Sequence, residues 1–77
     1  MILLESELIL KPGKYRHYKG RTYELICVAK HTETDEPLVI YRALYGDRKI
    51  WARPYSMWTE KVMVNGVETP RFTWIDD

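Results

Sequence analysis

The architecture is set by residues 22–53, which read TYELICVAKHTETDEPLVIYRALYGDRKIWAR. Three runs rich in Val, Ile and Tyr are separated by two polar segments, a pattern typical of β-strands joined by turns. The runs cover residues 22–31, 38–45 and 49–53. Pro54 ends the third run, because proline has no N–H to donate to a ladder. We therefore predict a continuous antiparallel meander of three strands.

Further strands are expected on both sides of this meander. Residues 14–18 form a strand before a Gly-containing turn, and residues 61–64 and 67–74 pair across an Asn-Gly dipeptide, which favours a type I′ turn. Residues 55–58 form one helical turn. The pattern predicts a mostly β protein, a small, partly open barrel of five to six antiparallel strands. The order of its elements resembles the SH3-like plan.

The chain length and the N-terminal segment predict the organisation and location of the protein. Its 77 residues make one domain over residues 1–77, with an apolar arm at 1–10 and the barrel at 11–74. The arm fits either a short helix or a strand. No apolar stretch is long enough to cross a membrane, and Glu5 and Glu7 interrupt any signal-peptide pattern. We expect a cytoplasmic protein.

Strict alternation along the strands divides the meander into two faces. If the strands pair across a loop at residues 32–37, Leu25 lies opposite Ala43 and Cys27 lies opposite Tyr41. Cys27, the single cysteine, is then a small buried hydrophobe. The predicted core face consists of Leu25, Cys27, Ala29, Val39, Tyr41, Ala43 and an inward-facing Trp51.

The opposite face carries an aliphatic stripe that a solvated sheet face would not have. Burying four such side chains contributes about 6–12 kcal/mol, as much as the whole stability of a small domain. We expect a cover, and the arm is the nearest candidate, with the last hairpin or a second subunit as alternatives. The stripe consists of Ile26, Val28, Leu38, Ile40, Leu44 and Ile50.

Two dense aromatic and basic segments, residues 15–20 and 51–58, indicate a binding surface. Rings stack on planar ligands, while Arg and Lys side chains bind anions. The basic residues also concentrate between residues 11 and 30, where Glu24 is the only acid, although the net charge of the chain is +1. The predicted ligand-binding residues are His17, Lys19, Arg42 and Arg53 for charge and hydrogen bonds, Tyr18, Tyr41 and Trp51 for stacking, and His31 with Glu33 as a polar rim.

These residues predict a non-catalytic binding module for an anionic or aromatic ligand such as a nucleotide, a nucleic acid or a peptide. One alternative is a structural protein that associates through its apolar sheet face, for instance as a homodimer. Another is a small hydrolase-type enzyme with a His base and Glu33. We predict no catalytic residue, no cofactor and no metal site, because the histidines and acids lack a recognised ligand spacing.

Five segments carry a recognisable pattern: KPGKYRHYKG (11–20), AKHTET (29–34), VIYRALYGD (39–47), WARP (51–54) and RF (71–72). Together they resemble a small bacterial family catalogued as domain of unknown function 1653. The resemblance covers residues 11–72, with Trp58 standing where the family pattern has Phe. It implies a bacterial or phage-like origin and a stand-alone domain, and it carries over no activity.

Overall fold

The computed structural model describes residues 10–75, which form seven strands and one short helix. The protein is therefore mostly β, as predicted. Within residues 10–75 no helix has the length and apolar character needed to cross a membrane. In chain order the elements are β1 (Gly13–His17), β2 (Thr22–Lys30), β3 (Pro37–Ala43), β4 (Ile50–Pro54), α1 (Tyr55–Trp58), β5 (Lys61–Val64), β6 (Val67–Pro70) and β7 (Phe72–Trp74).

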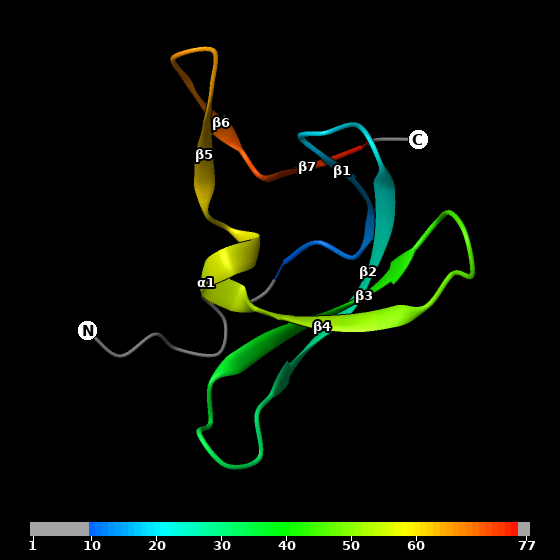
Figure 1. The fold of residues 1–77 in the computed structure, drawn as a ribbon. Coiled ribbons are helices and arrows are strands. Elements are labelled where there is room, and N and C mark those ends of the chain that lie inside the picture. Colours follow the sequence, from blue (N-terminus) through cyan, green and yellow to red (C-terminus); the bar gives the residue numbers. More distant parts are fainter. Residues whose placement is uncertain (1–9, 76–77) are drawn as a thin grey trace.

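Five strands form one antiparallel sheet in the order β4-β3-β2-β1-β7, and β5 and β6 form a separate two-stranded ribbon (Figure 1). The predicted meander is β2, β3 and β4. The sheet curves toward a barrel but does not close, because its edge strands β4 and β7 are not hydrogen-bonded to each other. The arrangement is consistent with a small, partly open barrel.

The helical turn and β5 have the predicted bounds, whereas the last predicted strand is divided in two. Pro70 ends β6, and the next N–H, that of Arg71, donates to the carbonyl of Glu60 at 3.1 Å. The chain then joins β1 as β7. This break raises the number of strands to seven. The β5–β6 turn follows the expected Asn-Gly chemistry, since Asn65 and Gly66 both have positive φ values.

A β-bulge between Leu25 and Cys27 makes the predicted register of β2 and β3 wrong. Leu25 lies opposite Tyr41, but Cys27 lies opposite Ile40, so Ile26 is an extra residue. Beyond the bulge each side chain is on the face opposite to the prediction. Cys27 is therefore exposed rather than buried, and Val28 replaces it at the core.

Trp58, and not Trp51, is the tryptophan at the centre of the core. Helix α1 places the Trp58 indole inside the curved sheet, where 2% of its surface is exposed. Trp51 lies opposite Tyr41 on the edge strand β4 and is 53% exposed. Trp51 thus shares the inner side with Tyr41, as predicted, but it is not buried, because no further strand covers that edge within residues 10–75. The buried cluster consists of Tyr15, Leu25, Val39, Tyr41, Trp58 and Phe72.

The outer face of the sheet keeps an apolar stripe with altered membership. Leu38 and Ile40 remain there, opposite Ala29 and Cys27, while Val28 has moved to the inner face. The expected arm over this face lies outside the described residues, apart from Leu10, which packs against the core cluster.

Candidate functional site

Trp58 packs with Leu25 and Val39 on the inner face, and aromatic and basic side chains gather at one end of this face. The antiparallel pairings place His17 opposite Phe72, Tyr23 opposite Ala43 and Arg53 opposite Val39, all on the inner side. The loops on either side of these strands add further rings and cations. We define the aromatic–basic cluster as His17, Tyr18, Lys19, Tyr23, Tyr45, Arg53 and Arg71, lying over the buried rings of Tyr41 and Phe72.

His17 lies at the centre of this cluster and contacts several of its members. Its ring contacts Tyr18 at 4.5 Å between centroids and meets the edge of Phe72 at 5.0 Å. The Lys19 backbone N–H donates to its Nδ1 at 3.1 Å, so the imidazole closes the turn that follows β1. Burial, and then the positive charges of Arg71, Arg53 and Lys19, lower the pKa of His17 below 6.5. The site is therefore a region of positive potential.

Arg53 joins the two edge strands of the sheet. Its Nε donates to Tyr41 Oη at 3.5 Å, and its guanidinium carbon lies 5.5 Å from the centroid of the Phe72 ring. No carboxylate within residues 10–75 pairs with Arg53. Neighbouring rings stabilise this half-buried guanidinium, but no acid neutralises its charge.

Tyr23 and Tyr45 form a hydrogen-bonded pair of rings within the cluster. Their hydroxyl oxygens lie 2.9 Å apart, and their rings meet edge to face at 5.5 Å. Arg21 lies over Tyr45, with 4.2 Å from its guanidinium carbon to the ring centroid. Burial, together with the hydrogen bond to Tyr45, raises the pKa of Tyr23 to about 12.

Arg71 belongs to the cluster but is already paired. Its Nη2 donates to Glu60 Oε1 at 2.5 Å, and its guanidinium carbon lies 5.9 Å from the Tyr18 ring. Its buried Nε has no hydrogen-bond partner. Of the two arginines, Arg53 is the one with charge available to a ligand.

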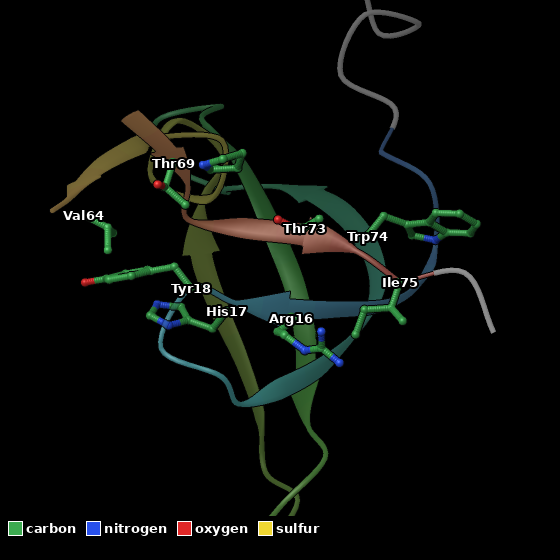
Figure 2. Close-up of a pocket in the computed structure, with 9 residues that line it drawn as sticks. Arg16, His17, Tyr18, Val64, Thr69, Thr73, Trp74 and Ile75 are labelled. Carbon is green, nitrogen blue, oxygen red and sulfur yellow. The ribbon is translucent and has the colours of Figure 1, made fainter. Parts of the chain in front are cut away.

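A groove of about 440 Å³ adjoins the cluster on the other side of β1 and β7 (Figure 2). His17 and Tyr18 lie at one end of it and Trp74 at the other, while Arg16 projects from the middle. The groove is lined by Arg16, His17, Tyr18, Val64, Thr69, Pro70, Thr73, Trp74 and Ile75. His17 and Tyr18 therefore connect the cluster with this groove.

Four of the nine predicted site residues belong to the cluster, namely His17, Tyr18, Lys19 and Arg53, and a fifth, Tyr41, is one of the buried rings beneath it. Trp51 lies beside them on the same side of the sheet, opposite Tyr41. The barrel end thus brings together what strand alternation alone would have separated.

The other three predicted residues lie elsewhere. His31 and Glu33 are at the β2–β3 turn, at the opposite end of β2 from His17 (Figure 1). There the Glu33 backbone N–H donates to His31 Nδ1 at 3.1 Å, so His31 has a turn-forming role. Arg42 is on the outer face between Glu24 and Ile50.

The predicted set missed four residues of this site: Tyr23, Tyr45, Arg71 and Phe72. Phe72 lies on β7, which pairs with the distant strand β1, and nothing in the local pattern around Tyr23 separates it from other core residues. The aromatic and basic segments at residues 15–20 and 51–58 indicate the right region of the protein. Only the order of the strands in the sheet shows which other rings lie beside them. Among residues 10–75 no group of three His, Cys, Asp or Glu side chains could hold a metal ion.

The fold and this cluster define a small, partly open β-barrel with rings and cations at one end. The chain belongs to the family described as protein of unknown function DUF1653, whose profile matches residues 13–74. The crystal structure of a member from Bordetella bronchiseptica is similar, at 37% sequence identity and a TM-score of 0.79, over 86% of this chain and 87% of that one. Its bacterial source agrees with the expected origin. Comparison with curated proteins gives no match.

Proposed function

We propose that the protein is a single-domain, non-catalytic binding module of SH3-like plan that acts in the cytoplasm. Its ligand is a small anion-bearing molecule with a planar group. The observation that carries this proposal is the Arg53 guanidinium, which lies against Tyr41 and Phe72 and has no carboxylate partner within residues 10–75. An anion would complete the charge balance of Arg53, and the exposed ring of Tyr18 would supply stacking surface.

The potential around His17 supports the same ligand chemistry. Burial and then three nearby cations lower the pKa of His17, and the same cations attract an anion. A bound phosphate near Arg53 and Lys19 would offset that field and raise the pKa of His17. The proposal uses no general base, since Nδ1 of each histidine already accepts a backbone hydrogen bond.

The test is a chemical-shift titration of the full chain with adenosine monophosphate, adenosine and inorganic phosphate. The monophosphate should move the resonances of His17, Tyr18 and the Arg53 side chain, and should bind more tightly than either fragment. It should also raise the pKa of His17, while the His31 resonances remain unchanged as an internal control. Binding should weaken as salt is raised.

Two arginine variants make the test specific. Arg53→Gln should weaken binding of the monophosphate at least about tenfold, since hydrogen bonds to charged groups contribute about 1.5–3 kcal/mol. Arg42→Gln, on the outer face, is the matched control and should bind like the wild type. Equal losses in both variants, or shifts that cluster away from the aromatic–basic cluster, would reject the proposal.

Association through the outer sheet face is the second candidate function. Ile26 and Ile50 are exposed large aliphatic side chains on or beside this face, next to Leu38 and Ile40. Sedimentation analysis distinguishes the two functions, because self-association through apolar surface persists at high salt. A monomer at all concentrations would eliminate this candidate.

A further inference from the structure

The outer edge of β4 carries backbone groups that no strand within residues 10–75 pairs. The Ala43 N–H donates to the Lys49 carbonyl, which fixes the phase of the antiparallel β3–β4 ladder. In that phase Trp51 and Arg53 direct their N–H and C=O groups toward β3, and Ile50 and Ala52 direct theirs away. The edge thus presents two donors and two acceptors in the spacing of a sheet ladder.

The side chains along this edge differ between the two sides of the sheet. On the inner side, Trp51 and Arg53 follow Lys49, which lies opposite Ala43. On the outer side, Ile50 and Ala52 continue the apolar stripe of Ile40. The Ile50 side chain is 53% exposed. One side of an added strand would therefore meet two cations with the exposed Trp51 between them, and the other side would meet aliphatic groups.

We propose that β4 binds an extended peptide as an added strand, and that this peptide alternates acidic and aliphatic residues. Its acidic side chains would lie beside Lys49 and Arg53, since opposite charges stabilise cross-strand neighbours. Its aliphatic side chains would extend the stripe beyond Ile50. Main-chain hydrogen bonds to Ile50 and Ala52 provide the docking, as in other cases of strand addition. This site does not depend on the proposed anion site, although both use Arg53.

Two observations favour this occupant over others. A second copy paired edge to edge would bring Arg48, Lys49 and Arg53 of both chains together, and like charges in adjacent strands are destabilising. The other sheet edge, β7, is only three residues long, and short edges resist strand addition. β4 is longer, basic and exposed, so an acidic strand is the complementary partner.

The experiment titrates the full, isotope-labelled chain with a synthetic ten-residue peptide of alternating valine and glutamate. The largest shifts should fall on the amides of Ile50 and Ala52, which should also gain protection from hydrogen exchange. The same peptide with lysine in place of glutamate should bind at least tenfold more weakly. A version N-methylated at every second residue, which retains the side chains and loses edge donors, should not bind.

Protein variants test the same edge from the other side. Ala52→Pro removes an N–H that faces away from β3 and should abolish binding, while Ala52→Val keeps that N–H and should bind like the wild type. Thermal unfolding of both variants checks that they are folded. If Ala52→Pro does not fold, the N-methylated peptide still decides the question.

The outcomes are distinguishable from those of the anion titration. Shifts that are largest on the Ile50 and Ala52 amides support strand addition, whether or not adenosine monophosphate binds. Equal binding of the glutamate and lysine peptides, full binding of the N-methylated peptide, shifts centred on β7, or a dimer that forms through β4 without peptide would each overturn the proposal.

Discussion

The indole of Trp58 lies flat on the ring of Phe72, with 3.7 Å between their centroids and 6° between their planes. Trp58 follows β4 through α1, and Phe72 begins β7, so this stack links the two edges of the five-stranded sheet. No backbone ladder joins these edges. Ring packing, with Arg53 above Phe72, therefore closes the barrel where hydrogen bonds do not.

The first prediction is that removing this indole is severely destabilising. Trp58 is 2% exposed and also meets Tyr15 edge to face at 5.4 Å. Trp58→Ala should lower the free energy of unfolding by about 3–5 kcal/mol, the usual cost of deleting a large buried aromatic. Trp58→Phe should cost less, because a phenyl ring can still stack on Phe72. Urea unfolding followed by circular dichroism measures both.

Trp51→Ala is the matched control, since it deletes the same side chain from an exposed position on β4. Surface changes of this kind usually alter stability by about 0.5 kcal/mol. A loss for Trp51→Ala equal to that for Trp58→Ala would mean that the core is not organised around Trp58.

The second prediction concerns the thiol of Cys27. Because the bulge turns this side chain to the exposed outer face, Ellman's reagent should modify it in the native protein. The rate should be within about tenfold of the rate for the urea-unfolded chain, since access and not burial governs it. Cys27→Ser, which has no thiol, is the negative control. Modification that occurs only after unfolding would show that Cys27 points inward.

That bulge also marks the limit of what alternation along a strand can predict. The residues from 22 to 30 read as one strand, and the structure has one strand there. The side-chain directions after Ile26 nevertheless depend on one extra residue, which is visible only in the register of β2 against β3. Element type follows from local composition, but the choice of face follows from a tertiary contact, so Cys27 and Val28 exchange places.

The composition of the candidate site likewise depends on contacts between segments that are distant in sequence. The aromatic and basic segments around His17 and Arg53 are visible locally, and both belong to the cluster. Phe72 becomes a site residue only because β7 leaves the hairpin after Pro70 and pairs with β1. His31 resembles a polar ligand in the sequence, yet its Nδ1 closes a turn. Sheet order, which joins distant segments, accounts for these differences.

The third prediction is that Tyr45 contributes to the raised pKa of Tyr23. Burial and the hydrogen bond to Tyr45 raise the pKa of Tyr23 from 10.0 to about 12. Its neutral form therefore stabilises the fold below pH 10, and this contribution is lost as the pH rises toward 12. Tyr45→Phe should lower the pKa of Tyr23 and reduce the steepness of alkaline destabilisation. Ultraviolet absorbance of the phenolate follows the titration.

Tyr18→Phe is the control for that titration, because Tyr18 does not contact Tyr23. It should leave the pKa of Tyr23 at the wild-type value. A Tyr45→Phe variant that also titrates like the wild type would show that the 2.9 Å contact between the two hydroxyls does not exist in solution.

The fourth prediction follows from the lowered pKa of His17. Burial and the nearby cations disfavour its protonation in the native state, whereas the unfolded chain binds a proton near pH 6.5. The unfolded state then binds more protons, so native stability falls as the pH drops below 6.5. His17→Gln should remove this contribution, and unfolding measured at about pH 7 and pH 5 should show a smaller loss than in the wild type. Tyr18→Phe, which keeps the imidazole, should retain the wild-type loss; an unaltered pH dependence in His17→Gln would contradict a lowered pKa of His17 in the native state.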